Sequence, residues 1–526
     1  MHAARSLVVH RLPGEGPLAL LASRQAQYLC NYLHELGATW AIEEPLYFDR
    51  DFLSEFATFY STSASGYSNA CQRLTFFSLP QAEDAAGVRS LLERALAGEE
   101  EAAGAMQRGF LGFTVLRPIR DARLARTVVR WYDDHPNKLP RTVEPTRPYH
   151  VHLAGLKLTV SGIAWQQQDQ AVGACATVAL WTMLHSSALD EHHSIPTTTL
   201  ITRAAHARSP LGQRAFPSKG LTMLQVLQAI QELGLAPILT EGNVTKNGLV
   251  LGFSREFFGS DLAAFIRSGY PVLLAGSSKA GEHAVCAVGV RSAPPPAAAP
   301  GDMRLEDESL EAVYIHDDNL GPNVRYVIRE IQQQGRTVVC LEPEAPVGQR
   351  AGRPFDDPLL GVGHFLPRYM VVAVHEEIRT SPSEVSAQAD HVTKRLSIVL
   401  AHAAAKAGIE APGLTVGLRY MRLSQYLGEE LPRRLSGQRL AAVRLELCES
   451  IPPMSLFVAV ARVGAFNAPI LDLVYDTTDS TPCLRAFAHV PIEPWASGLL
   501  DEAVALLPDS RWDKWIGPRA DPDREA

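Results

Sequence analysis

The sequence has no surplus of basic residues and no long apolar run. Lys and Arg total 49 of the 526 residues and Asp and Glu total 57, so the formal net charge is −8. Proteins that bind nucleic acid usually displace counterions with an excess of Lys and Arg, so this balance argues against a nucleic-acid partner. No stretch approaches the roughly 18 apolar residues of a membrane-spanning helix, and the N-terminus lacks the apolar core of a signal peptide. We therefore expect a cytoplasmic protein with no membrane span.

Cysteines are few and scattered, and none forms a CxxC pair. An odd number of widely spaced cysteines argues against both a disulfide framework and a zinc finger. The sequence also lacks HExxH, GxxxxGK[ST] and GxGxxG, the patterns of zinc peptidases, P-loops and dinucleotide sites. We therefore expect no metal, no cofactor and reduced thiols at the seven positions, Cys30, Cys71, Cys175, Cys286, Cys340, Cys448 and Cys483.

The composition is that of an ordinary globular protein, with 46% apolar and 20% charged residues. At roughly 150 residues per domain, the length predicts about three domains. Four prolines within residues 133–148 indicate a connector between an N-terminal domain, residues 1–148, and a middle domain, residues 149–375. Residues 376–526 form a C-terminal domain. Mixed helical and strand patterns predict a multidomain α/β (α+β) fold, and no pattern indicates a role for either flanking domain.

Hydrophobic patterns in the flanking domains indicate both helices and strands. The helices are expected at Ser23–Leu36, Ala82–Ala105 and Ala387–Ala405. The strands are expected at Ser6–His10, Phe110–Leu116, Ala125–Trp131, Ser455–Val463 and Pro469–Asp476. Two Pro-rich segments, Ser292–Met303 and Glu342–Pro358, indicate an insertion and a loop.

The stretch WQQQDQAVGACATVALWTML, residues 165–184, carries the first sign of chemistry. The residues after Cys175 are apolar almost all round, which is typical of a buried central helix with Cys175 at its N-terminus. The N–H groups and the dipole of a helix N-terminus favour an anion such as a thiolate. The N–H of Cys175 and an upstream Gln could then bind an oxyanion. Cys175 is therefore a candidate nucleophile, whereas the other six cysteines are expected to be core residues.

A candidate base lies further along the chain, in YPVLLAGSSKAGEHAVCAVGV. The pattern predicts strands at Pro271–Ala275 and His283–Val290, joined by a turn from Gly276 to Glu282. His283 would begin the second strand, from which its ring can face a cleft. An imidazole in this place can draw the proton from a thiol.

A third group must orient the imidazole, and the next strand suggests one. In EAVYIHDDNLGP, Ala312–Ile315 is expected to be a short strand, and Asp317 follows its end. Asp318 and Asn319 compete for the same role. All three also fit a simple turn, because Asp and Asn are favoured there.

These three segments together resemble the papain-like cysteine peptidase superfamily, and they are most similar to its bacteriocin-processing leader-peptidase branch. The resemblance covers about residues 160–330, roughly a third of the chain. It implies a papain-like middle domain in which a buried helix packs on an antiparallel sheet. It also implies that Cys175 is the nucleophile, His283 the general base and Asp317 the group that orients the imidazole.

The resemblance further implies an oxyanion-hole glutamine before the cysteine. The family commonly has this Gln six residues before the Cys, where the present chain has Asp169. Gln168 lies seven residues before Cys175 and Gln170 five residues before it. Gln168 is the candidate that we assign, although a Gln in a polar loop needs no special role.

Two groups of metal-type side chains also occur, Asp190–His193 and His316–Asp318. Neither has a recognised zinc spacing, so we interpret both as solvated polar loops.

The residues therefore predict a cysteine peptidase or hydrolase that cleaves an amide bond of a peptide or protein substrate. A transglutaminase-like acyltransferase would use the same triad with an amine in place of water. A non-catalytic papain-like module that binds a peptide or a partner is a third reading, because Gly173 and Ala174 replace the family's usual residues beside the Cys. No pattern indicates an oligomeric state.

Overall fold

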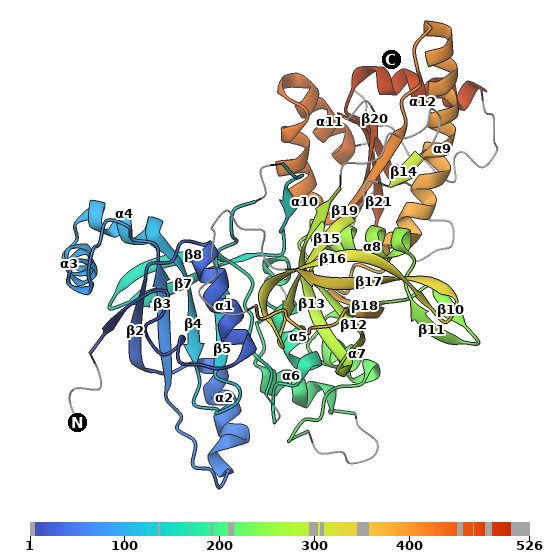
Figure 1. The fold of residues 1–526 in the computed structure, drawn as a ribbon. Coiled ribbons are helices and arrows are strands. Elements are labelled where there is room, and N and C mark those ends of the chain that lie inside the picture. Colours follow the sequence, from blue (N-terminus) through green and yellow to red (C-terminus); the bar gives the residue numbers. More distant parts are fainter. Residues whose placement is uncertain are drawn as a thin grey trace. The chain divides into compact units, whose positions relative to one another are not determined.

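The computed structural model of the chain describes residues 6–134, 137–169, 171–190, 193–208, 215–293, 303–305, 310–344, 357–449, 456–465, 468–478 and 486–506. The chain divides into two compact units. Unit 1 consists of Met1–Phe253, Gly269–Arg291 and Glu311–Ala373, and unit 2 consists of Ser254–Ser268, Ser292–Leu310 and Val374–Ala526. Helices and strands are mixed in both units (Figure 1), so the expected multidomain α/β fold is confirmed.

An antiparallel five-stranded sheet occupies the N-terminal part of unit 1, with its strands in sequence order. The strands are β1 (Val8–Arg11), β2 (Trp40–Tyr47), β3 (Cys71–Phe77), β4 (Phe110–Leu116) and β5 (Leu124–Val129). The apolar run FLGFTVL predicts the bounds of β4, and every residue of β4 is buried. Strand residues with this apolar character stabilise the sheet by burial on both faces.

Four helices accompany this sheet, namely α1 (Arg24–Glu35), α2 (Arg50–Thr58), α3 (Ala85–Leu96) and α4 (Glu100–Gly109). The Ser23 side chain caps α1 by accepting a hydrogen bond from the Ala26 N–H. The single helix expected at Ala82–Ala105 is wrong, because that stretch is divided between α3 and α4. Gly98 lies between them with φ at +94°, a value that a right-handed helix cannot continue through.

A larger sheet carries most of the candidate residues. Its strands lie in the order β17–β16–β15–β13–β12–β18–β9, and the short strand β6 pairs with β13. Their bounds are β6 (Arg141–Thr142), β9 (Ala236–Glu241), β12 (Val272–Ser278), β13 (Gly281–Ser292), β15 (Leu310–Asp317), β16 (Gly321–Gln333), β17 (Arg336–Glu344) and β18 (Leu366–Val374). The pairs around the candidate site, β12–β13 and β15–β16, are antiparallel.

The turn between β12 and β13 is shorter than the sequence suggests. The expected turn from Gly276 to Glu282 is wrong, because β12 continues to Ser278 and only Lys279 and Ala280 form the turn. Gly276 is needed for another reason. A Cβ atom there would collide with the Leu366 carbonyl, so glycine lets β12 and β18 approach closely.

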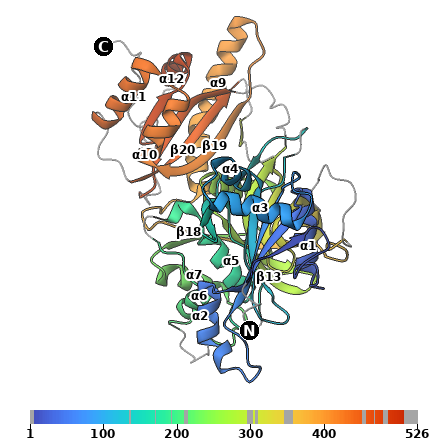
Figure 2. The ribbon, with the colours of Figure 1, turned by 90° about the vertical axis from the view of Figure 1, so that its left-hand side faces the viewer.

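The helix α5 (Cys175–Met183) packs on this sheet through β12. All its residues after Cys175 are buried, which confirms the expected buried helix on an antiparallel sheet. Figure 2 shows α5 beside α6 (Thr198–Ala205) and α7 (Met223–Glu232), with α2 next to α6. Two hairpins complete unit 1, formed by β7 (Arg147–Leu153) with β8 (Leu156–Gly162) and by β10 (Val244–Lys246) with β11 (Leu249–Gly252).

The N-terminal sheet and the larger sheet belong to one unit. Tyr32 of α1 accepts a hydrogen bond of 3.0 Å from the Asn323 amide of β16. Thr127 of β5 and Trp165 exchange backbone hydrogen bonds of 2.8 and 2.9 Å. The boundary expected between residues 148 and 149 therefore falls inside unit 1, because the segment that leads to Cys175 adds to the edge of the N-terminal sheet. The boundary expected between 375 and 376 lies beside Val374, where the last segment of unit 2 begins.

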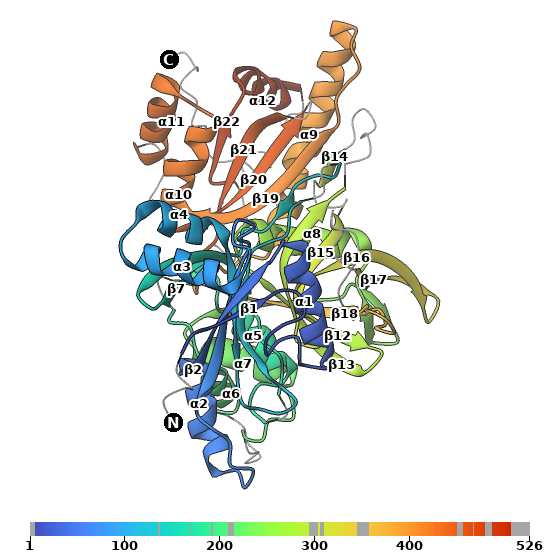
Figure 3. The ribbon, with the colours of Figure 1, turned by 60° about the vertical axis from the view of Figure 1, so that its left-hand side comes forward.

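Unit 2 is built on a second five-stranded sheet in the order β14–β19–β20–β21–β22. Its strands are β14 (Met303–Leu305), β19 (Leu414–Arg422), β20 (Phe457–Ala465), β21 (Ala468–Asp476) and β22 (Ala488–Pro491). Its helices are α8 (Arg255–Arg267), α9 (Pro382–Ala407), α10 (Leu423–Gln425), α11 (Gly437–Glu449) and α12 (Pro494–Leu506). Figures 1 and 3 show α9 and α11 on opposite faces of this sheet. The segments α8 and β14, which the sequence assigns to the middle domain, thus belong to unit 2.

The helix α9 is 26 residues long and contains the stretch Ala387–Ala405 that the sequence predicts as helical. A capping box at Ser381 begins it, and Gly408 in the left-handed region ends it. Across the described ranges, no helix is both long enough and apolar enough to cross a membrane. Most of the two segments expected as an insertion and a loop, residues 294–302 and 345–356, lies outside the described residues.

Candidate active site

Cys175 is the first residue of α5, as the sequence predicts. Ala174 is the N-cap residue, and its methyl group cannot accept a hydrogen bond. The first N–H groups of the helix are therefore not bonded to the side chain of their N-cap residue. Cys175 is partly exposed, whereas the rest of the helix is buried. A sulfur in this position meets an electropositive helix end and still has access to solvent.

The remaining cysteines are of two kinds. Cys30, Cys71, Cys286 and Cys340 are buried, as expected of core residues. The same expectation is wrong for Cys448, which is exposed because Val443 and Leu447 form the buried face of α11 and Cys448 lies off that face. Cys483 lies outside the described residues. Cys175 and Cys448 are thus the two thiols of the described residues that solvent reaches.

His283 is the third residue of β13, next to the hairpin turn. The Cys175 thiol interacts with its ring and raises the pKa of the imidazole. On the acidic side of the ring, His283 Nε2 lies 3.3 Å from Asp317 Oδ1 and 3.4 Å from Asp318 Oδ1. Phe365 packs edge-on against the ring. Because Nε2 faces the carboxylates, Nδ1 is the ring nitrogen left for the thiol.

Asp317 is the last residue of β15, and several neighbours fix its position. The Tyr326 hydroxyl donates a hydrogen bond of 2.6 Å to Oδ2, and the Asn319 N–H donates one of 2.8 Å to Oδ1. The Trp165 indole N–H donates a hydrogen bond of 2.9 Å to the Asp317 carbonyl. Both carboxylate oxygens are therefore held before any contact with His283 is counted.

Asp318 and Asn319 also reach the imidazole, so all three candidates for the orienting role lie at His283. Asn319 Nδ2 is 3.3 Å from His283 Nε2. Asp318 is 2% exposed, and neither of its carboxylate oxygens accepts a well-formed hydrogen bond. Of the three side chains, Asp317 is thus the one with the most complete set of supporting contacts.

The charges in this cluster change one another's protonation. Burial alone would lower the pKa of His283, but Asp318, Asp317 and the Cys175 thiol raise it well above 6.5. Burial raises the pKa of Asp318 to about 7, despite the attraction of His283. Burial would also raise the pKa of Asp317, but its bonds to His283, Tyr326 and Asn319 lower it below 3.8. At neutral pH the cluster therefore favours an imidazolium beside an ionised Asp317.

Gln168 lies at this site, but among the described residues it forms no hydrogen bond with the Cys175 sulfur. Its Nε2 donates a hydrogen bond of 2.7 Å to Asn319 Oδ1. A second glutamine that the sequence reasoning missed is Gln166, whose buried Nε2 has no hydrogen-bond partner among the described residues. Gln170 lies outside the described residues. The Gln168 amide is thus joined to the acidic side of His283 through Asn319.

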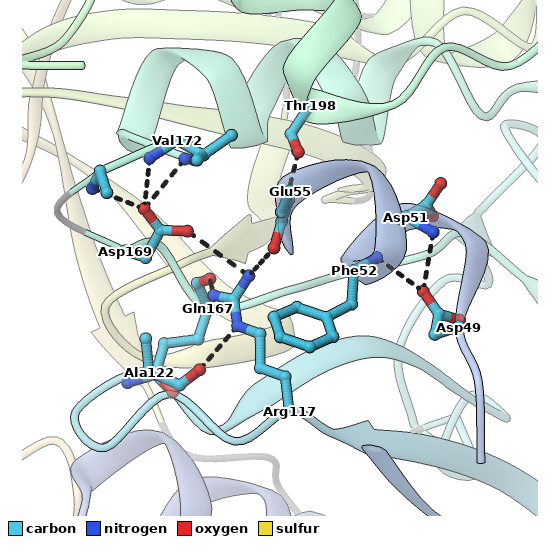
Figure 4. Close-up of polar contacts among 12 residues, drawn as sticks. Asp49, Asp51, Phe52, Glu55, Arg117, Ala122, Gln167, Asp169, Val172 and Thr198 are labelled. Atoms are coloured by element: carbon cyan, nitrogen blue, oxygen red, sulfur yellow. Dashed lines mark hydrogen bonds and ion pairs between the residues drawn. The ribbon is translucent and has the colours of Figure 1, made fainter. Parts of the chain in front are cut away.

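Position 169, where the resembled family has its glutamine, instead organises the loop before α5. Asp169 Oδ1 accepts hydrogen bonds from the N–H groups of Ala171, Val172 and Gly173, at 2.7, 2.6 and 3.1 Å. Figure 4 shows this carboxylate between the loop and the side chain of Arg117. A single buried side chain therefore fixes the backbone that leads directly to Cys175.

Arg117 contacts that loop through Gln167 and Asp169, and it is fully buried. It donates hydrogen bonds of 2.7 Å to the Ala122 carbonyl, 2.6 Å to the Gln167 carbonyl and 2.9 Å to Glu55 Oε2. Its Nη1 lies 3.6 Å from Asp169 Oδ2 (Figure 4). Burial raises the pKa of Glu55 to about 7. Sequence reasoning missed this cluster, whose members come from α2, the end of β4 and the loop before α5.

One of the two metal-type groups found in the sequence is not solvated. His316, Asp317 and Asp318 are 4%, 5% and 2% exposed, so their interpretation as a solvated loop is wrong. The ring of His316 bonds instead to the Ile163 carbonyl and the Asn323 N–H. In the other group, His193 is buried, while Glu191 and His192 lie outside the described residues. His283, Asp317 and Asp318 together present three donor atoms that could hold a metal ion.

Neither a protein-family model nor a curated protein sequence matches this chain.

Proposed function

We propose that the chain is a papain-like cysteine hydrolase that cleaves an amide bond of a peptide or protein. The observation that carries the proposal is the convergence of three side chains: the Cys175 thiol raises the pKa of the His283 ring, and His283 Nε2 lies 3.3 Å from Asp317 Oδ1. These residues come from α5, β13 and β15, in the order of the bacteriocin-processing leader-peptidase branch. A base held between a nucleophile and an orienting carboxylate is the arrangement that activates thiols and hydroxyls.

In the proposed reaction, the resting pair is a Cys175 thiolate beside the His283 imidazolium, and it forms when the thiol proton passes to the ring. Cys175 Sγ attacks the carbonyl carbon, and the carbonyl oxygen becomes an oxyanion that accepts a hydrogen bond from the Cys175 N–H. The Gln168 amide, which bonds to Asn319 in this structure, would be the second donor once it turns toward the sulfur. His283 then gives its proton to the leaving amine, the C–N bond breaks and a thioester remains. Water gives a proton to His283 and attacks the thioester, which releases the acid. This step restores the thiolate beside the imidazolium.

We assign the orienting role to Asp317. Its two oxygens are held by Tyr326 and by the Asn319 N–H, and its lowered pKa keeps it ionised. Asp318 adds negative charge beside His283 but has no comparable support. In this assignment Asp317 sets the orientation of the ring, and Asp318 raises the affinity of the ring for its proton.

A cytoplasmic location is also part of the proposal. The six cysteines of the described residues are all free. A reducing compartment preserves free thiols, and a thiolate nucleophile needs such conditions.

The first experiment compares two thiols of the same chain by alkylation with iodoacetamide at pH 5.5, with mass spectrometry as the readout. Cys448 is the internal control, because it is more exposed than Cys175. Pairing with an imidazolium at a helix N-terminus should make Cys175 react faster by about tenfold or more. Equal rates, or a faster Cys448, would support the reading of a non-catalytic module.

The second experiment measures cleavage of a mixed peptide library by the full-length chain. A Cys175→Ala variant should show no cleavage above background, whereas a Cys448→Ala variant should cleave like the unmodified chain. Adding a primary amine distinguishes acyl transfer from hydrolysis, because a transferase joins that amine to the acyl group. Cleavage that persists in Cys175→Ala would refute the mechanism.

A further inference from the structure

The acidic side of His283 has the donor atoms and the spacing of a metal site. Nε2 of His283 and one carboxylate oxygen each of Asp317 and Asp318 lie within 4.8 Å of one another. The three side chains are 9%, 7% and 2% exposed, so they form an enclosed cluster rather than a solvated group of acids. One imidazole nitrogen with carboxylate oxygens is a ligand set that zinc and similar ions use in proteins.

The distances fit a small ion. Zinc binds nitrogen and oxygen at about 2.0–2.1 Å, so two ligands of a tetrahedral site are about 3.3–3.4 Å apart. The separations from His283 Nε2 are 3.3 Å to Asp317 Oδ1 and 3.4 Å to Asp318 Oδ1. An ion could therefore bind Nε2 and either oxygen with little movement of these side chains.

Asp318 is the independent sign of a ligand. It is 2% exposed, its Oδ1 has an ion contact of 3.4 Å with His283 Nε2, and neither carboxylate oxygen accepts a well-formed hydrogen bond in the described structure. Buried polar atoms are nearly always satisfied, and an exception calls for a reason such as an ion. Its Oδ1 points toward His283 Nε2, the atom that the other ligands face.

We propose that His283, Asp317 and Asp318 form a binding site for a divalent transition-metal ion of the zinc type. Two carboxylates balance the charge of the ion, and the imidazole supplies the nitrogen ligand. Outer hydrogen bonds from Tyr326 and the Asn319 N–H to Asp317 would hold one ligand in place. Cys175 interacts with the same ring and is not a ligand in this site.

The ion and the thiol chemistry would compete for His283, a consequence that rests on the proposed function. A metal on Nε2 replaces the proton there, so the ring can no longer form the imidazolium that protonates the leaving amine. Occupancy would therefore suppress hydrolysis. The metal site itself does not depend on the hydrolase proposal.

The test titrates the full-length chain with Zn²⁺ by calorimetry. A phosphine reductant keeps the cysteines reduced without adding a thiol that would bind zinc. The Asp318→Asn variant should bind one zinc ion fewer per chain than the unmodified chain, or bind that ion at least about tenfold more weakly, because it lacks one ligand. Cys175→Ala should bind zinc as the unmodified chain does. Asp121→Asn, at an exposed aspartate, is the matched control and should also bind normally. Unchanged zinc binding in Asp318→Asn would overturn the site.

Cobalt gives a second measurement that needs no variant at the site. Co²⁺ bound by nitrogen and oxygen shows d–d absorption without a thiolate-to-cobalt charge-transfer band. A strong charge-transfer band that disappears in Cys175→Ala would instead mean that the metal binds the thiol and the ring, which contradicts the proposal. Both measurements decide the metal site even if the chain cleaves no peptide. Conversely, zinc binding without inhibition of an active chain would refute the competition for His283.

Discussion

The cluster around Arg117 and the cluster around His283 each hold one cation against two buried carboxylates. Their acidic partners are Glu55 and Asp169 in the first cluster and Asp317 and Asp318 in the second. In each cluster one carboxylate is in excess of the positive charge, and burial raises the pKa of one carboxyl group to about 7. The charge count is therefore the same in both, and the differences lie in the hydrogen bonds.

Arg117 cannot lose its proton in the ordinary pH range, and it bonds to two backbone carbonyls as well as to Glu55. His283 can lose its proton, touches a partly exposed thiol and faces Asp318, whose oxygens lack well-formed hydrogen bonds. The Arg117 cluster, with a permanent cation that bonds to the backbone, fixes a loop. An incomplete cluster with a titratable cation is suited to moving protons or binding an ion.

The largest expected effect comes from breaking the Arg117 cluster. Arg117→Met leaves Glu55 and Asp169 buried without their cation, so the free energy of unfolding should fall by about 3–5 kcal/mol. Urea unfolding followed by circular dichroism measures this loss. The backbone at Gln167 also loses its anchor, so alkylation of Cys175 should slow as well.

Arg89→Met is the matched control for this change, because Arg89 forms an exposed ion pair with Glu93 one helical turn away. Its unfolding midpoint should stay close to that of the unmodified chain. An Arg117→Met chain that unfolds like this control would show that the buried cluster does not stabilise the fold.

Breaking the titratable cluster should affect reactivity more than stability. His283→Gln keeps a hydrogen-bonding side chain but cannot form a cation beside the thiol. Alkylation of Cys175 at pH 5.5 should slow by about 100-fold, in line with the contribution of a positioned base. Cys448 in the same chain should react at its usual rate and serves as the reference. If both thiols keep their rates, His283 does not activate Cys175.

Glu55 tests whether the stability of the Arg117 cluster depends on pH. Its ordinary pKa is 4.5 and its folded pKa is about 7, so the folded chain binds this proton more tightly. The stability that the group contributes is present below pH 4.5 and is lost as pH rises through 7, with a slope of at most about 1.4 kcal/mol per pH unit. Glu55→Gln has no carboxyl group to titrate and lacks this loss. Between pH 5 and 7, the free energy of unfolding of the variant should therefore rise relative to that of the unmodified chain. Parallel curves would contradict the raised pKa.

The elements that carry the candidate triad could be predicted because their signals are local. An all-round apolar stretch after Cys175 predicts a buried helix that begins there, and α5 does. Alternating or continuous apolar runs predict β13 and β15, which place His283 and Asp317 near a turn and a strand end. Local signals also misled: Gly276, whose role is to let two strands approach closely, looks like a turn signal in a sequence.

The Arg117 cluster could not be predicted, because no local pattern joins its members. Arg117 is 62 residues from Glu55 and 50 from Gln167 along the chain. A charged residue after an apolar strand is ordinarily a surface residue, and its burial follows only from how the segment before Cys175 pairs with β5. The same pairing explains why no unit boundary occurs at residue 148.

Asp318→Asn gives the smallest and most selective effect in this comparison. Asp318 raises the pKa of His283 only when it is ionised, and its own pKa is about 7. The variant should therefore match the unmodified chain at pH 5 and differ above pH 7, where the pKa of His283 should be lower than in the unmodified chain. Histidine NMR, with the His283 signal assigned by its loss in His283→Gln, measures this without any substrate. An unchanged His283 titration would mean that Asp317 is the one carboxylate that sets the charge of the imidazole. The two clusters would then have in common only that each contains two carboxylates.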